Sequence, residues 1–191
     1  SDKPNRFDHK EIYEVMDLCL SCKGCKSECP SNVDMAKLKA EFLQHYYDAN
    51  GVPLRSKLIA HFTLTARLGA LAPALYNFFV GNKLTGSLIK KLSGFAVGRS
   101  MPTLYHTTLQ KWYKKRHLTG TGKRKIYFFA DEFTNYNDTG IGIKAIELLE
   151  ALGYEVVIPQ HVESGRTWLS KGLIRDAKKI VNEILRLLTP L

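Results

Sequence analysis

Four cysteines lie within eleven residues near the amino end of the chain, and the sequence contains no others. They are Cys19, Cys22, Cys25 and Cys29, separated by two, two and three residues, and Pro30 follows directly. Thiolates one short turn apart can face a common centre from several sides, while Gly24 lets the backbone come close to that centre. Pro30 redirects the chain after the fourth sulfur. The spacing therefore predicts a site that binds a metal centre through sulfur.

The run C-x2-C-x2-C-x3-C-P is the spacing that [4Fe-4S] proteins of the bacterial ferredoxin type use. We therefore expect Cys19, Cys22, Cys25 and Cys29 to bind a [4Fe-4S] cluster. Structural zinc prefers two separated C-x2-C pairs, which can converge tetrahedrally. A disulfide framework suits small secreted domains, whereas 191 residues are enough to build a hydrophobic core. A redox dithiol needs only one C-x2-C pair. Zinc and thiol chemistry are the weaker alternatives.

The same spacing raises the question of a second cluster. In two-cluster domains the fourth cysteine of each run binds the other cluster. On that pattern Cys29 contributes to a second cluster, whose remaining ligands this sequence lacks. The chain also begins at Ser1, in a polar stretch without Met. We therefore expect a fragment of a longer protein with a partner cysteine run upstream. The alternative is a complete module in which all four cysteines bind one cluster.

The net charge of +10 is concentrated in the middle of the chain. The 82 residues from 49 to 130 contain 14 Lys and Arg and neither Asp nor Glu. Such a stretch is a solvated helical face, a docking surface for an anionic membrane or an acidic partner, or a nucleic-acid site. No nucleic-acid motif accompanies the charge, so we expect no nucleic-acid partner. No apolar run is long enough to predict a transmembrane helix.

Periodicity predicts a largely helical first part of the chain. We expect a helix over 8–18, then the cysteine loop. A capping box at Ser31 and Asp34 would start a second helix that reaches about Tyr47. Further helices are expected over 54–80, with a break near Pro73, over 84–94 and over 103–117. The polar stretch 119–122 is the best candidate for a domain boundary.

After that boundary the pattern changes to β-α-β-α. We expect a buried strand over 125–130, a helix over 140–152 with Leu152 facing inward, a strand over 154–158 and a long helix over 169–188. Two strands joined by a helix imply a parallel pair, and two strands make a poor sheet alone. The predicted class is therefore α+β: a helical ferredoxin-like domain (1–52), a basic helical connector (53–119) and an α/β domain truncated at its carboxyl end (120–191).

Weaker signals lie in the α/β part. Gly140-Ile141-Gly142 lacks the full dinucleotide pattern, and an ordinary helix start is the preferred interpretation. His161, Glu163 and Arg166 follow the second strand at the edge where open α/β sheets build sites. They either contact a ligand there or form a local polar network. The remaining histidines show no metal spacing and are expected at the surface: His9, His45, His61, His106 and His117.

The segment from Cys19 to Leu43 resembles the second cluster motif of FAD-linked 2-hydroxyacid dehydrogenases of the D-lactate, glycolate and 2-hydroxyglutarate type. It is also similar to the iron–sulfur subunit of anaerobic glycerol-3-phosphate dehydrogenase. The α/β part resembles the cysteine-rich domain of these proteins through Asp131-Glu132-Phe133-Thr134-Asn135, Gly165-Arg166 and Ser170-Lys171-Gly172-Leu173. Together the resemblance covers roughly 10–50 and 120–191.

One departure limits what this resemblance implies. Glu163 and Ser164 stand where the family has a cysteine pair, so no cluster is expected in that loop. For the rest, the resemblance implies an electron-transfer portion that passes electrons from FAD towards a quinone or another acceptor. The FAD would lie on an upstream domain or a partner subunit, and this chain alone would catalyse nothing.

Reduced thiols favour a cytoplasmic location, with peripheral attachment at the inner face of a membrane as an option. The alternative function is a basic helical docking module for a membrane or an acidic partner. In that case the cluster would be structural or a sensor.

Overall fold

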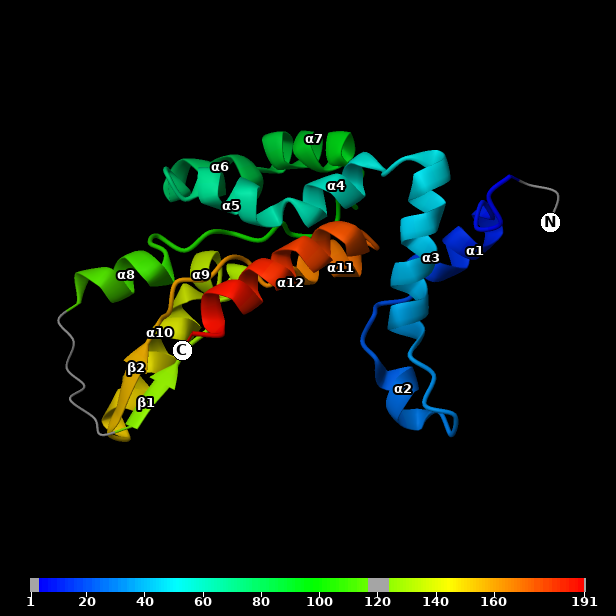
Figure 1. Ribbon diagram of the computed structural model, residues 1–191. Helices are drawn as coiled ribbons and strands as arrows, with labels where there is room; N and C mark the ends of the chain where they lie inside the picture. Colours follow the sequence, from blue (N-terminus) through cyan, green and yellow to red (C-terminus); the bar gives the residue numbers. More distant parts are fainter. Residues whose placement is uncertain (1–3, 117–123, 191) are drawn as a thin grey trace. The chain divides into compact units, whose positions relative to one another are not determined.

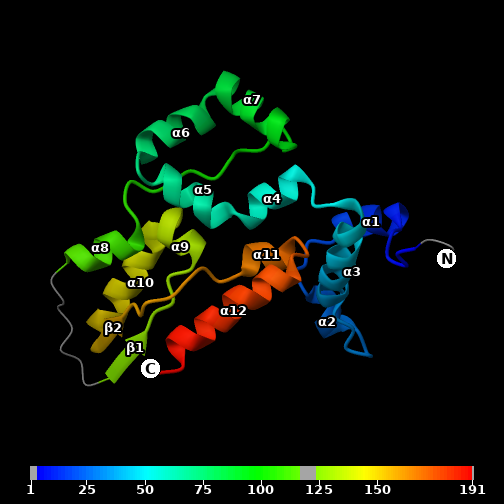
Figure 2. The ribbon, with the colours of Figure 1, turned by 45° about the horizontal axis from the view of Figure 1, so that its top comes forward.

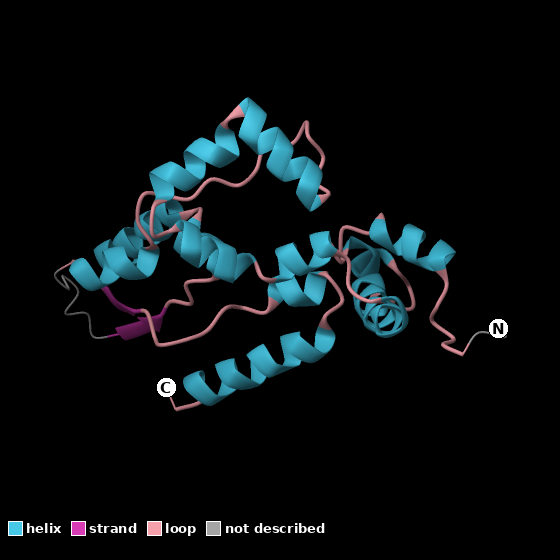
Figure 3. Ribbon diagram, turned by 90° about the horizontal axis from the view of Figure 1, so that it is seen from above, coloured by secondary structure: helices cyan, strands magenta, loops and turns pink. Residues whose placement is uncertain are grey.

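The computed structural model describes residues 4–116 and 124–190, which form helices and one small sheet (Figures 1 and 3). The helices are α1 (Lys10–Asp17), α2 (Gly24–Glu28), α3 (Met35–Asn50), α4 (Leu54–Ala60), α5 (Phe62–Gly69), α6 (Pro73–Gly81), α7 (Lys83–Ser93), α8 (Leu109–Lys115), α9 (Glu132–Tyr136), α10 (Thr139–Ala151), α11 (Arg166–Ser170) and α12 (Ile174–Leu188). The strands are β1 (Arg124–Tyr127) and β2 (Tyr154–Val157). The expected α+β class is confirmed, whereas the ferredoxin-like character of 1–52 stays a prediction.

Backbone contacts divide the chain into two compact units, which are considered separately. The first comprises residues 1–61 and 165–182, and the second comprises 62–164 and 183–191. Each unit thus consists of two separate stretches of sequence. The domains expected from the sequence, 1–52, 53–119 and 120–191, are each one continuous range. That three-part division stays a prediction, and its expected boundary at 119–122 lies outside the described residues.

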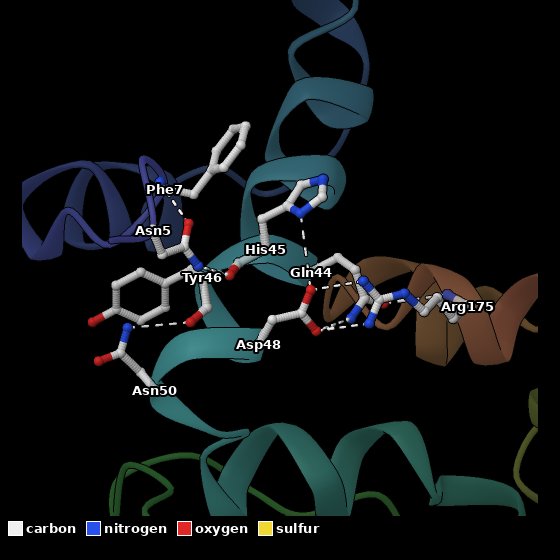
Figure 4. Close-up of polar contacts among 8 residues, drawn as sticks. All are labelled: Asn5, Phe7, Gln44, His45, Tyr46, Asp48, Asn50 and Arg175. Atoms are coloured by element: carbon white, nitrogen blue, oxygen red, sulfur yellow. Dashed lines mark hydrogen bonds and ion pairs between the residues drawn. The ribbon is translucent and has the colours of Figure 1, made fainter. Parts of the chain in front are cut away.

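The first unit is built around α3. Its core consists of Phe42, Leu43, Tyr47, Ala60 and Leu173, with Tyr13 and Met16 of α1 packed against it. The N-cap of α3 is Asp34, whose carboxylate accepts a hydrogen bond from the Lys37 amide at 3.1 Å. The expectation that Ser31 would cap this helix was wrong, because the residue whose side chain bonds the first-turn amides is Asp34. At the other end of α3, Asp48 binds Arg175 of α12 (Figure 4).

The long helix expected over 169–188 is two helices. Gly172 lies between α11 and α12 with φ of 74°, a left-handed conformation that favours glycine. A Cβ built on Gly172 would lie 2.2 Å from Cβ of Leu43. The glycine therefore both turns the chain and lets the Leu173 segment reach the core of the first unit.

The second unit contains the sheet, in which β1 and β2 are parallel with Ile126 opposite Val156. Helix α10 connects them, which confirms the expected β-α-β unit. Its core consists of Leu109, Ala130, Ile146 and Val156. The expectation of a buried first strand was wrong, because Arg124, Lys125 and Tyr127 are exposed. Leu152 is also exposed, since it follows the last turn of α10 rather than lying on the inner face.

The middle of the chain is more broken than expected. The range 54–80 contains α4, α5 and all but the last residue of α6, with Pro73 at the first position of α6. In the range 103–117, α8 starts only at Leu109, capped by Thr108. The residues before α8 are not helical. There the Asn77 side chain donates to the Leu104 carbonyl oxygen at 2.7 Å and accepts from the Leu104 amide at 2.8 Å. None of the helices in the described ranges combines the length and apolarity needed to span a bilayer.

Candidate functional site

The four cysteines lie between α1 and α3, as expected. Cys19 and Cys22 are in the loop, Cys25 is in α2, and Cys29 follows the last residue of α2. All four are free thiols; Cys19 and Cys29 are half-buried, whereas Cys22 and Cys25 are exposed. The Cys29 amide donates to the Cys25 carbonyl oxygen at 3.0 Å, so these two cysteines are one helical turn apart.

The backbone of this segment is turned by residues other than glycine. Ser21, Lys23 and Asn32 have φ of 56°, 61° and 53°. A non-glycine residue in this left-handed region costs on the order of 1 kcal/mol, and such residues concentrate at functional sites. Gly24 is not strained, and a Cβ there would lie 3.7 Å from Sγ of Cys22, an ordinary contact. The close turns between the cysteines therefore do not depend on Gly24.

Backbone amides are directed at two of the sulfurs. The Ser21 amide donates to Sγ of Cys19 at 3.4 Å. Hydrogen bonds from the amides of Val33 and Ser31 lower the pKa of the Cys29 thiol, opposed by slight desolvation and assisted by the amide of Asn32. Since the thiolate is the form that binds metal, this arrangement favours ligation by Cys29. Such amides also tune the potential of sulfur-bound iron.

Positive charge is tied to the same segment. Lys39 of α3 is buried, and its ammonium donates to the backbone carbonyl of Cys19 at 2.6 Å. Burial lowers the pKa of Lys171, and the nearby Lys39 and Arg55 act in the same direction while Asp17 opposes them. Lys39 could not be identified from the sequence, because twenty residues separate it from Cys19 and no local pattern connects the two.

The described residues contain no group of three or more His, Cys, Asp or Glu arranged to hold a metal ion. The expected convergence of all four sulfurs is therefore not shown. The chemistry of the donor set nevertheless fits a cluster: four free thiols on one segment, amides on two sulfurs and a buried lysine beside Cys19. A second cluster would need further ligands, since the sequence has no other cysteine.

The two loops after the strands form a polar network in the second unit. Glu132 is buried and accepts hydrogen bonds from the amide and hydroxyl of Ser164, at 3.0 and 2.8 Å. The hydroxyl of Thr63 donates to Glu163. Glu163 and Ser164, which replace the cysteine pair of the resembled family, therefore make side-chain hydrogen bonds that hold the loop. This favours the local-network interpretation of Glu163 over ligand contact.

The remaining residues singled out in the sequence lie in the α/β part or just before it. His161 stacks on Phe129 with ring centroids 4.2 Å apart, and its Nδ1 lies 2.8 Å from the Val162 carbonyl oxygen. Gly142 lies in the first turns of α10, where a Cβ would come within 2.7 Å of Leu109, so packing accounts for this glycine and an ordinary helix start is observed. Arg166 is exposed at the start of α11, and His117 lies outside the described residues.

Comparison with known proteins gives similarity to one kind of enzyme. The chain is 29% identical to a D-2-hydroxyglutarate dehydrogenase of Escherichia coli (strain K12) over 197 aligned positions, which cover 95% of this chain and 19% of that protein. It is 26% identical to the D-2-hydroxyglutarate dehydrogenase of Haemophilus influenzae, covering 91% of this chain and 18% of the relative. It is 29% identical to the D-2-hydroxyglutarate dehydrogenase of Pseudomonas putida, covering 91% of this chain and 19% of that protein.

The chain thus spans about one fifth of the length of the curated relatives it matches. No protein-family model matches it, and no solved structure does. Its similarity to dehydrogenases of a 2-hydroxy acid agrees with the family resemblance drawn from the sequence.

Proposed function

We propose that this chain is the iron–sulfur electron-transfer portion of a FAD-linked dehydrogenase that oxidises a 2-hydroxy acid. The observation that carries the proposal is the segment from Cys19 to Cys29, with four free thiols and backbone amides directed at two sulfurs. The similarity to D-2-hydroxyglutarate dehydrogenases supplies the reaction class. The flavin and the 2-hydroxy acid would bind to another domain or subunit, so this chain alone would not catalyse the oxidation.

Each residue of the segment has a role in this proposal. In this chain Cys19, Cys22, Cys25 and Cys29 would hold one cluster as thiolates; in a longer protein with a partner cysteine run, Cys29 would bind the second cluster instead. A bound [4Fe-4S] cluster supplies one-electron transfer. The amides of Ser21, Ser31 and Val33 stabilise negative charge on sulfur, and Lys39 anchors the Cys19 backbone. The acceptor would be a quinone or another redox partner at the cytoplasmic face of a membrane.

The proposal is tested by anaerobic reconstitution with iron and sulfide. The reconstituted chain should be brown, and dithionite should bleach the colour and produce an electron paramagnetic resonance signal. Cys22→Ala should lose both, because one of the four sulfur ligands is removed. Ser27→Ala is the matched control, since Ser27 lies in the same segment and its hydroxyl bonds only the Gly24 carbonyl. Retention of colour and signal by Cys22→Ala would contradict the ligand assignment.

A second function is favoured by the exposed side chains of α6 and α7, two helices of the second unit that are labelled in Figure 2. Leu84, Leu88 and Leu92 are spaced by four residues and therefore share one face of α7. They are 83%, 58% and 72% exposed, and Phe78 of α6 is also exposed. Apolar side chains that border lysines on an acid-free segment are typical of a helix that lies on an anionic membrane. We propose that α6 and α7 dock this chain on such a surface.

Co-sedimentation with vesicles tests this docking. The chain should bind vesicles of mixed phosphatidylserine and phosphatidylcholine, bind much less to phosphatidylcholine alone, and release at high salt. The variant Leu84→Gln/Leu88→Gln/Leu92→Gln should bind less, whereas Leu148→Gln, an exposed leucine on α10, should bind normally. Absence of binding to the anionic vesicles would refute the proposal. Binding to an acidic protein instead would assign the surface to a partner domain.

A further inference from the structure

A cavity of about 220 Å³ lies within the second unit, between α5, α8 and α9. Three cationic side chains line it: Arg67 of α5, and Lys111 and Lys114 of α8. The two lysines are three residues apart and therefore lie on the same side of their helix. Neutral polar residues complete the polar lining, namely Thr108, Gln110, Asn135 and Tyr136, and Ala70 and Leu71 add an apolar edge. Among the residues that the structure describes, no carboxylate lines the cavity.

The three cations are not neutralised by the protein. Within the described ranges, Arg67, Lys111 and Lys114 make no ion pair. In contrast, Arg116 at the end of α8 pairs with Glu150, with 2.5 Å between Nη2 and Oε1. The Glu163 carboxylate does not line the cavity, although its charge acts on Tyr136; it accepts a hydrogen bond from Thr63. Like charges that converge on a hollow repel one another, so an anion between them would lower the free energy of the arrangement.

The neutral groups of the cavity are held in place. Thr108 and Asn135 are buried. The Thr108 hydroxyl accepts from the Lys111 backbone amide at 3.1 Å, and the side-chain Oδ1 of Asn135 accepts from the Gln110 backbone amide at 3.0 Å. Burial raises the pKa of Tyr136, so its phenol is protonated at neutral pH and can donate a hydrogen bond. The cavity thus combines three cationic side chains, which are exposed, with neutral groups able to orient an oxyanion.

We propose that this cavity binds a small molecule that carries at least two negative charges on phosphate or carboxylate oxygens. Three positive charges in the lining match a multiply charged ligand better than a single carboxylate. The planar guanidinium of Arg67 can bind such a group through two parallel hydrogen bonds, while the lysines act as point charges. The volume is below that of a site for a drug-sized molecule, so the ligand is small.

This site differs from the cysteine segment in position and chemistry, and the inference does not rest on the electron-transfer proposal. Its three cationic residues belong to the acid-free part of the sequence, 49–130, whose charge alone suggested only a surface. The cavity assigns part of that charge to a defined pocket.

Titration calorimetry of the 191-residue chain at low salt tests the inference. The probes are inorganic phosphate and succinate, with acetate as the singly charged control. Phosphate, succinate or both should bind, and acetate should bind at least about tenfold more weakly, since it can engage fewer cations. Preference for phosphate would assign a phosphorylated ligand, and preference for succinate a dicarboxylate. Absence of binding by both would overturn the proposal.

Matched variants show whether the cavity is the site. Arg67→Gln and Lys114→Gln should each weaken binding of the bound probe by about tenfold, because each removes one charged contact. Lys115→Gln removes the same charge from the same helix without touching the cavity, and it should leave binding within about twofold. If Lys115→Gln weakened binding as much as Lys114→Gln, the effect would be general charge attraction, and the proposed site would be wrong.

Discussion

Single residues show how strongly burial decides the effect of a charge. The ion pair of Arg116 with Glu150 is largely buried, with side chains 13% and 10% exposed. The Arg116 guanidinium also lies over the rings of Trp112 and Tyr113, 5.0 and 4.7 Å from their centroids. The ion pair of Lys144 with Glu147 is exposed. The two pairs involve the same helix, α10, and therefore provide a direct comparison.

We expect Glu150→Gln to lower the free energy of unfolding by about 3 kcal/mol, because the buried Arg116 would lose its counter-charge. Glu147→Gln should change stability little, since water screens its pair with Lys144. Chemical denaturation of both variants measures the difference. Equal stability of the two variants would contradict the buried pair.

Both the backbone conformation and the packing of the core require glycine at position 172. We expect Gly172→Ala to destabilise the protein by at least about 2 kcal/mol, through its left-handed φ and the clash with Leu43. Gly81→Ala is the control, because a Cβ at Gly81 meets nothing within 4 Å and Gly81 lacks a positive φ. A melting temperature for Gly172→Ala equal to that of the control would refute this explanation.

At the scale of elements, α3 and α12 are joined by a bidentate ion pair in the first unit (Figure 4). Nη1 and Nη2 of Arg175 each lie 2.7 Å from a carboxylate oxygen of Asp48. Two neighbours on α3 also contact this pair. The Gln44 side chain accepts a hydrogen bond from the Arg175 backbone amide, and Nδ1 of His45 lies 3.8 Å from the Asp48 carboxylate.

The hydrogen bond to Arg175 lowers the pKa of Asp48, against slight desolvation. A carboxyl whose pKa is lower in the folded state stabilises the fold above its unfolded value of about 3.9, and this contribution disappears as the pH falls through the folded pKa. We therefore expect Arg175→Gln to be less stable than the wild type near neutral pH and equally stable in strong acid. Thermal unfolding across this pH range measures it; a constant difference at all pH values would contradict the assignment.

Elements with their own local signals could be predicted from the sequence. α10 and β2 agree with their expected ranges to within a residue, because periodicity and Gly153 mark their ends. Elements whose ends depend on distant partners could not. The late start of α8 follows from the pairing of Asn77 with Leu104, and the break before α12 follows from the contact of Gly172 with Leu43. Neither contact leaves a pattern in the neighbouring sequence.

For the molecule as a whole, the cysteine segment could be located from spacing alone, but its surroundings could not. The contact of Lys39 with the Cys19 carbonyl and the cavity between Arg67 and α8 both join residues far apart in sequence. The acid-free composition of 49–130 left a solvated helical face and a docking surface open, and it gave no indication of a cavity. Only the structure shows which cationic side chains line the same cavity.

The central claim is that Cys19, Cys22, Cys25 and Cys29 together bind iron and sulfide. Iron, sulfide and zinc analysis of the anaerobically reconstituted 191-residue chain tests it most directly, alongside the four single Cys→Ser variants. We expect about four irons and four sulfides per wild-type chain and a clear loss in every variant. One zinc per chain without sulfide, or full iron content in any of the four variants, would contradict it.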